Sequence, residues 1–256
     1  MTKPDLAAEL EAARRGRFTI TSRRGTGDAV SLDAAYELGK DLERERVSAG
    51  WRPAGWKLGF TNQALWKGLG LESPIRARIY DQTLRSGDLD SADLVQARIE
   101  PEIVVGFGVD VPQVSGHDAI ADAVEWVAAG LEVVQCHFEH WEMTPAEAIA
   151  DAGVHAALAI GPRTKVNAEA ARGLAAATCR LLRDGDLTET GSGAYVLGGP
   201  LDALHWLLRR LPGGVRAGEI VTTGTLTRAM PIESGQRWEH RLSAAIAIKP
   251  VELRIR

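Results

Sequence analysis

The N-terminal part of the chain repeats its apolar residues at helical spacing. A short helix is predicted over residues 5–15 and a longer one from Leu32 to about Ala49, for which Ser31 is a good N-cap. Another helical stretch is predicted from about Gln63 to Leu69. Residues 1–74 are therefore expected to be mostly helical.

Beyond residue 74 the pattern changes to short runs rich in Ile, Val and Phe, which are typical of strands. The predicted strands are Ile75–Tyr80, Glu100–Phe107, Leu131–Phe138, Ala156–Gly161, Glu219–Thr227 and the strand-forming tail Arg237–Leu253. The helices predicted between them are Asp118–Ala129, stopped by Gly130, Ala168–Arg183, and Leu201–Leu211, opened by Pro200. We therefore predict an α+β fold in one continuous domain, with a helical region over 1–74 and a strand-rich catalytic body over 75–256.

Composition and charge narrow the class of protein. The 256 residues are 45% hydrophobic and 25% charged, as in ordinary globular proteins, and the net charge of −4 gives no basic surface for nucleic acid or anionic lipid. Cys136 and Cys179 form no metal-binding or disulfide pattern. The polar N-terminus and the lack of a run of about 18 apolar residues predict a cytoplasmic protein without membrane partners.

Two glutamates in one predicted strand suggest a metal site. Glu100 and Glu102 stand two positions apart, so their side chains should point to the same face. Like charges that lead into the apolar run Ile103–Val105 resist burial unless a cation neutralises them, and oxygen ligands suit Mg²⁺, Mn²⁺ or Ca²⁺. The alternative is an edge strand that shows both charges to water, with Pro101 tolerated there.

A third glutamate lies in another apolar strand. Glu132 lies within the apolar segment Gly130–Val134. It needs a partner there, because an unpaired buried charge is very costly. A salt bridge is one solution. The other solution is that Glu132 binds the same cation as Glu100 and Glu102. Three carboxylates would leave coordination positions on that cation for water and substrate.

Three further charged residues are ambiguous when taken singly. Lys57, which lies between an aromatic residue and a leucine with glycines on either side, either faces a closed pocket or extends to solvent along its apolar neighbours. Asp81 ends a strand and Asp151 precedes Ala152-Gly153, so both have an alternative role as turn residues.

Five segments in a fixed order resemble one known family. They are Gly55–Thr61 (GWKLGFT), Arg98–Ile103 (RIEPEI), Leu131–Val134 (LEVV), Leu197–Leu201 (LGGPL) and Ala217–Gly224 (AGEIVTTG). Together they resemble the 2-hydroxypenta-2,4-dienoate (2-keto-4-pentenoate) hydratase and 4-oxalocrotonate decarboxylase family, which has the fumarylacetoacetate-hydrolase-like fold. The resemblance covers residues 30–240, and the Glu-x-Glu pair with its later Glu is the most specific part.

The resemblance implies a mixed β-roll body, with Mg²⁺ or Mn²⁺ on Glu100, Glu102 and Glu132. It implies a small 2-oxo acid chelated through its carboxylate and 2-oxo oxygen, with the metal stabilising enolate charge as a Lewis acid. It also implies a role in the breakdown of aromatic compounds and a homo-oligomer.

The resemblance also assigns residues around the metal. Lys57 would hold the substrate anion or relay a proton, and Asp81 would orient Lys57 or water. The residues expected to bind substrate are Leu58, Gly59, Asp151, Thr223 and Gly224.

Three segments depart from the family. Gln135-Cys136-His137 replaces the usual Asp-Ser-Arg, Asp151–Val154 replaces Asp-Asn-Ala-Ser, and Ser243–Ala245 replaces a late Gly-Leu-Gly. The metal ligands survive while groups that fix the substrate do not, so an unusual substrate and lost activity are both open. His137 is a candidate anion-binding group, and a surface position is its alternative.

Several functions remain to be separated. Hydratase and decarboxylase share the same visible residues, and Trp56 and the Glu132 strand favour the hydratase. Acylpyruvate hydrolases of the same fold use an early histidine, whereas the first histidine here is His117. A non-catalytic binding protein that kept the fold is the alternative from another class. Motifs for a serine nucleophile, a nucleotide loop or a zinc site are absent from the sequence.

Overall fold

The computed structural model describes residues 5–69 and 71–256, in which fourteen strands form two sheets. The larger sheet has the order β2-β1-β11-β5-β6-β7-β3, with β12 beside β5 and β8 beside β6. Its strands are β1 (Pro53–Gly59), β2 (Ile75–Tyr80), β3 (Leu84–Arg85), β5 (Arg98–Phe107), β6 (Val124–Val134), β7 (His155–Ile160), β8 (Thr164–Lys165), β11 (Ile220–Thr225) and β12 (Met230–Pro231).

The smaller sheet has the order β10-β9-β13-β14-β4. Its strands are β4 (Asp88–Leu89), β9 (Thr178–Arg183), β10 (Asp186–Ser192), β13 (Arg237–Ser243) and β14 (Val251–Ile255). Both sheets mix parallel and antiparallel pairs, since β1–β11, β3–β7 and β14–β4 are parallel. The predicted α+β class with a mixed β body is confirmed.

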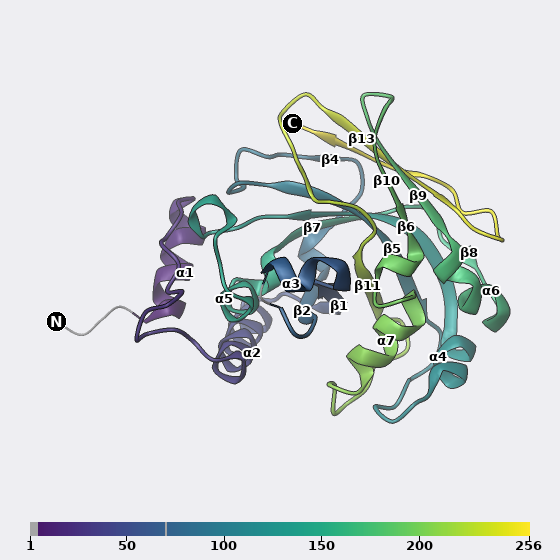
Figure 1. Ribbon diagram of the computed structural model, residues 1–256, viewed down its shortest axis with the longest axis horizontal. Helices are drawn as coiled ribbons and strands as arrows, with labels where there is room; N and C mark the ends of the chain where they lie inside the picture. The colour runs from purple at the N-terminus through teal and green to yellow at the C-terminus, as the bar shows by residue number, and fades with distance from the viewer. Residues whose placement is uncertain (1–4, 70) are drawn as a thin grey trace.

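The helices gather at two ends of the sheets, as Figure 1 shows. At one end lie α1 (Leu6–Gly16), α2 (Leu32–Ser48) and α5 (Pro145–Ala150), and at the other lie α4 (His117–Ala123), α6 (Ala168–Arg172) and α7 (Pro200–Leu208), while α3 is Trp66–Leu69. Short 3-10 turns are η1 (Gln63–Leu65), η2 (Asp81–Thr83), η3 (Glu139–Trp141), η4 (Ala152–Val154), η5 (Gly173–Ala176) and η6 (Gly193–Tyr195). Ser31 caps α2 as predicted, because its side chain accepts a hydrogen bond from the amide of Ala34.

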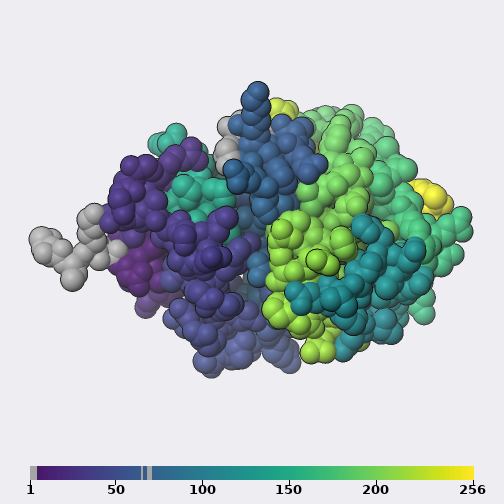
Figure 2. Space-filling view, turned by 60° about the horizontal axis from the view of Figure 1, so that its bottom comes forward, coloured from purple at the N-terminus to yellow at the C-terminus, as the bar shows by residue number. Residues whose placement is uncertain are grey.

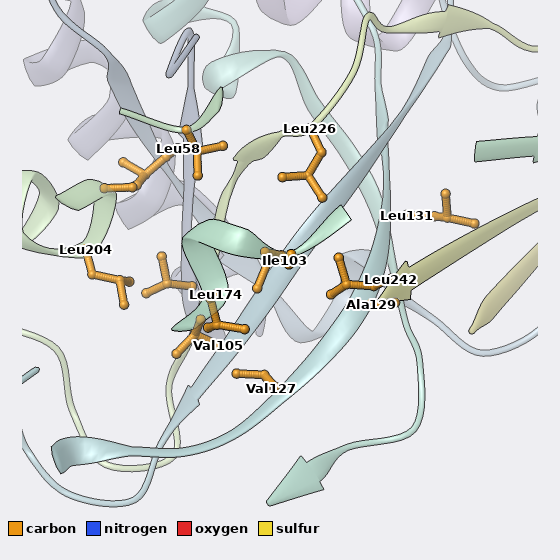
Figure 3. Close-up of a cluster of buried hydrophobic side chains, with 14 of the residues drawn as sticks. Leu58, Ile103, Val105, Val127, Ala129, Leu131, Leu174, Leu204, Leu226 and Leu242 are labelled. Atoms are coloured by element: carbon orange, nitrogen blue, oxygen red, sulfur yellow. The ribbon is translucent and has the colours of Figure 1, made fainter. Parts of the chain in front are cut away.

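The main hydrophobic core lies between the two sheets and is closed by α7 and η5. Figure 3 shows side chains from both sides of it, which include Leu58, Ile103, Val105, Val127, Ala129, Leu131, Leu174, Leu204 and Leu242. Alternation along β5 sends Ile103 and Val105 into this core. Glu100 and Glu102 consequently project from the opposite face of the sheet.

The helix predicted over Asp118–Ala129 is wrong in its second half. The chain leaves α4 early, and Val124–Val134 forms β6 along the whole length of β5. The strong helical preference of alanine is overridden here, because pairing with β5 buries this segment in the sheet. Gly130, which the sequence predicted as a helix stop, lies in β6 opposite Glu102, where a Cβ would approach Val104 Cγ2 within 2.5 Å.

The single helix predicted over Ala168–Arg183 is also wrong. It stops at Arg172, the 3-10 turn η5 follows, and β9 then pairs with β10. The connection between these strands is Asp184-Gly185, and both residues have positive φ values of 55° and 97°. An Asp-Gly pair is the sequence signal for such a two-residue hairpin turn.

Two strand boundaries differ from the prediction. The strand expected over Leu131–Phe138 ends at Val134, so Gln135–Phe138 lie outside it. The larger sheet also includes β1, which lies upstream of residue 75 within the region expected to be helical. In the described part of the chain, no helix is long and apolar enough to cross a membrane.

Candidate metal centre

Three glutamates meet on the face of the larger sheet that lies opposite the core. Glu100 and Glu102 lie on β5, and Glu132 of β6 is the direct partner of Glu100. One oxygen from each carboxylate lies within 4.8 Å of the other two. The alternative of an edge strand is wrong, because β5 is paired with β11 on one side and β6 on the other.

Two of these carboxylates each have one hydrogen-bonded oxygen and one oxygen without a hydrogen bond. Glu102 Oε2 accepts a hydrogen bond from the Gly224 amide at 2.9 Å, while its Oε1 is buried without a partner. Glu132 Oε1 lies 2.6 Å from His155 Nδ1, while its Oε2 is buried without a hydrogen bond. Glu100 is partly exposed. Oriented carboxylates with free oxygens fit a hard divalent cation that takes one oxygen from each.

The protonation of the cluster shows why it suits a cation. Burial raises the pKa of Glu100 to about 7, with Lys57 opposing the rise and Glu102 adding to it. Burial likewise raises the pKa of Glu132 to about 7, again with Lys57 opposing. The pKa of Glu102 is raised well above its usual value by burial and by the neighbouring Glu132. A divalent cation would favour the ionised form of all three.

Lys57 is the one cation placed directly against Glu132 in the described structure. Its side chain is 2% exposed, so the alternative of a lysine extending to solvent is wrong. Its Nζ donates to the Gly153 carbonyl at 3.0 Å and lies 3.4 Å from Glu132 Oε2. Burial lowers the pKa of Lys57, but Glu132 and Glu100 outweigh it, so the pKa is raised. A single ammonium therefore faces three carboxylates and leaves them incompletely neutralised.

The turn that holds Lys57 has an unusual backbone. Ala152, Gly153 and Val154 have consecutive positive φ values of 56°, 64° and 57°. Such a conformation is costly for alanine and for a β-branched residue, and strain of this kind concentrates at functional sites. The turn covers Lys57 closely, since a Cβ on Gly153 would lie 3.2 Å from Lys57 Cδ.

Asp151 anchors the start of this turn and is not a surface turn residue, since it is 3% exposed. Its carboxylate accepts from the His137 amide at 3.0 Å and lies 2.9 Å from His137 Nδ1, and Arg14 of α1 contacts it at 3.3 Å. His137 is buried, so its alternative as a surface residue is wrong. Both residues are engaged with each other.

The other predicted site residues take different positions. Asp81 lies at the surface and pairs with Arg52 Nε at 2.6 Å, which lowers the pKa of Asp81, and the structure does not bring it to Lys57. Leu58 points into the core, whereas Gly59 borders Lys57, whose Nζ lies 3.6 Å from the place of a Gly59 Cβ.

Thr223 and Gly224 lie on β11 beside β5. The Thr223 hydroxyl donates to the Ile103 carbonyl at 3.3 Å, and the Gly224 amide supports Glu102. Gly224 has a φ of +107°, and a Cβ there would meet Thr61 Oγ1 at 2.0 Å. Only glycine therefore fits where the backbone reaches Glu102.

Sequence reasoning missed three residues near the glutamates. His155 connects Glu132 to Thr83, whose hydroxyl lies 2.8 Å from His155 Nε2, and burial holds the pKa of His155 well below its usual value. Arg98 stacks on Trp141 at 4.5 Å, and its charge opposes the rise in the pKa of Glu100. Arg98 stands two positions before Glu100, so period-two alternation was an available signal. No local signal pointed to His155.

The chain belongs to the fumarylacetoacetate hydrolase family. The family described as "Fumarylacetoacetate (FAA) hydrolase C-terminal" matches residues 79–248. Two similar proteins are named 2-keto-4-pentenoate hydratase. That of Paraburkholderia xenovorans (strain LB400) is 28% identical over 96% of this chain and 93% of its own length. That of Burkholderia vietnamiensis is 31% identical over 86% of each chain. The predicted family and the predicted lyase class are confirmed.

Solved structures show the same fold. The 4-oxalocrotonate decarboxylase from Pseudomonas putida G7, complexed with magnesium and adipate, has a TM-score of 0.88 and 24% identity over 98% of this chain and 95% of its own. The fumarylpyruvate hydrolase from Pseudomonas aeruginosa, in complex with Mn²⁺ and pyruvate, has a TM-score of 0.57 and 15% identity over 78% of this chain and 88% of its own.

Proposed function

We propose that this protein is a divalent-metal-dependent lyase that hydrates a small 2-oxo acid or its dienol, of the 2-keto-4-pentenoate type. The observation that carries the proposal is a pair of buried carboxylate oxygens, Glu102 Oε1 and Glu132 Oε2, that have no hydrogen-bond partner. Both carboxylates lie next to that of Glu100. The names of the similar hydratases support the reaction class. Glu100, Glu102 and Glu132 would hold Mg²⁺ or Mn²⁺, and the protein would act as a homo-oligomer.

The bound ion would act as a Lewis acid that stabilises the negative charge formed on the substrate oxygens. Lys57 is suited to hold a substrate anion, because its raised pKa keeps it charged at neutral pH, and we propose that its ammonium also passes a proton to the substrate. The Gly153 carbonyl fixes the ammonium beside Glu132. A neutral His155 that donates from Nδ1 keeps Glu132 Oε1 occupied, so Oε2 has no hydrogen bond and faces only the ammonium of Lys57, 3.4 Å away.

One observation favours a second candidate, a decarboxylase of the 4-oxalocrotonate type. Arg98 forms no ion pair with the described residues, and with Trp141 it lines an open cavity of about 570 Å³. It lies close enough to Glu100 for its charge to oppose the rise in the pKa of that carboxyl. A guanidinium in this position suits the second carboxylate of a dicarboxylic substrate.

The experiment that tests the proposal is the ultraviolet loss of 2-hydroxypenta-2,4-dienoate with Mg²⁺, with Mn²⁺ and after metal removal. We expect metal-dependent loss with formation of a hydrated product. Faster loss of 4-oxalocrotonate with release of CO₂, abolished in R98Q, would select the decarboxylase. Binding of the metal without turnover of either compound would support a non-catalytic protein.

The metal assignment is tested with E102Q. The amide can still accept from Gly224 but places an NH₂ group where the free oxygen lay, so it should abolish metal binding and activity. The metal-free variant should fold at least as stably as the wild type, because one repelling carboxylate is gone. Calorimetric titration with Mn²⁺ and thermal unfolding measure both effects. E125Q, on the exposed side of β6, is the matched control. A fully active E102Q would contradict the assignment.

A further inference from the structure

A second cavity, of about 400 Å³, lies away from the glutamates. Its walls are α2, β2 and the segment that follows α7, and Figure 2 shows the hollow between the purple α2 and the yellow-green segment. Trp56 lines it, whereas the next residue of β1, Lys57, points to the glutamates. The cavity and the candidate metal centre therefore use opposite faces of β1.

The cavity is strongly cationic. Its charged lining residues are Lys40, Arg46, Arg76, Arg78, Arg210 and Arg216, against Glu43 and Glu219. Both carboxylates are already engaged by Arg78, at 2.9 Å for Glu43 and 2.8 Å for Glu219. Lys40 and Arg216 have acidic partners of their own in Glu37 and Asp110.

Three arginines in the cavity lack such partners among the described residues. One of them, Arg46, lies over the rings of Trp51 and Tyr80, at 4.9 and 5.0 Å from their centroids. Among the described residues, Arg76 and Arg210 form no ion pair, and Arg76 Nε is buried without a hydrogen bond. The guanidinium carbon of each lies over an aromatic ring, 4.2 Å from the centroid, Arg76 over Tyr36 and Arg210 over Trp206. Burial lowers the pKa of Arg210, and the charge of Arg76 lowers it further. The charges of Arg76 and Arg210 thus lie close enough to act on each other, and neither forms an ion pair with a carboxylate of the described residues.

A buried donor without an acceptor is costly and commonly marks an absent water or ion. A second such donor, Trp56 Nε1, lies in the same cavity. Guanidinium groups bind carboxylate and phosphate oxygens through paired hydrogen bonds, and ring stacking removes much of the entropy cost of ordering them.

We propose that this cavity binds a small oxyanion with at least two negative charges, either a polycarboxylate or a phosphate compound, between Arg76 and Arg210. Its volume is in the range of small-molecule sites. The acidic metal centre on the other face would repel the same ligand, so the two sites select different chemistry. Bound anion would rest on β2 and on Trp56, the neighbour of Lys57 in β1.

The test is calorimetric titration of the full-length protein with citrate and, separately, with pyrophosphate. The buffer is stripped of divalent metal on a chelating resin and held at constant ionic strength, because citrate could otherwise bind through a metal ion. We expect saturable binding of at least one anion with a Kd below about 1 mM. Citrate alone would identify a polycarboxylate site, and pyrophosphate alone a phosphate site.

R76Q and R210Q should each weaken this binding by at least about tenfold, which one lost charged hydrogen bond can account for. R76K, which keeps the charge but loses the planar fork, should fall between R76Q and the wild type. R163Q is the matched control, since Arg163 stacks on Trp126 outside the cavity. Thermal unfolding without anion verifies that the variants fold.

Three outcomes would overturn the proposal. The first is that neither anion gives a saturable heat of binding. The second is that R163Q and R76Q weaken anion binding equally. The third is that R76Q changes subunit assembly while the wild type binds no anion. The last outcome, detected by light scattering after gel filtration, would make the cavity a contact between copies of the chain.

Discussion

At the scale of single residues, the glutamate cluster is a problem of charge. Three carboxylates share a buried face of the sheet, and Lys57 supplies one positive charge to them. The excess of negative charge raises the pKa of Lys57, and burial with too little positive charge raises the pKa values of Glu100 and Glu132. The side chains are therefore arranged to bind a cation in addition to the ammonium of Lys57.

The variant K57M separates the proposed role of the metal from the proposed catalytic role of Lys57. Methionine fills much of the same volume without the charge, so the metal-free variant should lose stability at pH 8, where the carboxylates must then protonate or repel. Mn²⁺ should restore that stability, and turnover should remain at least about a hundredfold below the wild type, the scale of a lost proton donor. Thermal unfolding with and without Mn²⁺ and steady-state kinetics measure these effects. Normal kinetics would remove Lys57 from the site.

At the scale of elements, the η4 turn connects the helical region to the catalytic face. Asp151 at its start is held by His137 and by Arg14 of α1, and Gly153 at its centre holds Lys57. The strained backbone of Ala152 and Val154 persists because these contacts fix both sides of the turn.

G153A tests whether this turn positions Lys57. The added methyl would lie 2.5 Å from Ala77 Cβ at a φ of +64°, so the turn must shift and carry its carbonyl away from the ammonium. We expect a loss of about 1–3 kcal/mol in the free energy of unfolding and a fall in kcat larger than the change in KM.

Urea unfolding and kinetics of G153A are compared with G25A. Gly25 has a φ of +73°, but a methyl group added there would have no atom within 4 Å, so G25A reports the backbone strain alone. Equal behaviour of G153A and G25A would show that the contact with Lys57 has no role.

At the scale of the whole molecule, His240 joins the two sheets. It lies on β13 of the smaller sheet, and its Nδ1 donates to the Gly130 carbonyl in β6 of the larger sheet at 3.0 Å. Burial lowers its pKa to about 4, with the hydrogen bond to Gly130 opposing. Its Nε2 is buried without a partner, so protonation would place an unpaired charge between the sheets.

The pH dependence of stability follows from this shift. Between about pH 6.5 and 4 the unfolded chain binds a proton at His240 that the folded protein does not, so the free energy of unfolding falls as the pH falls. The full contribution is about 3 kcal/mol. H240N, which keeps a donor near Nδ1, should remove this part of the slope in urea unfolding at pH 4–7.

H140N is the control for H240N, because His140 is exposed and its φ of 56° is one that asparagine tolerates. An unchanged slope in H240N would contradict the assignment of this titration to His240.

Local properties of the sequence were enough to predict several features of the structure. Ser31 as the cap of α2, the buried face of α1 and the strands β2 and β5 depend on nearest neighbours and on side-chain periodicity. The helix errors at Asp118–Ala129 and Ala168–Arg183 arose because pairing with distant strands overrode the local helical preference of their alanines.

By itself the sequence determined that Glu100 and Glu102 share a face and that Glu132 needs a partner, because alternation and the cost of buried charge are local properties. Only the tertiary structure decided what surrounds them. Pairing of β5 with β6 set Glu132 against Glu100, and the η4 turn and β7 brought Gly153 and His155 to the site. Such contacts join residues far apart in the chain, so they depend on strand register and packing, which no short stretch of sequence encodes.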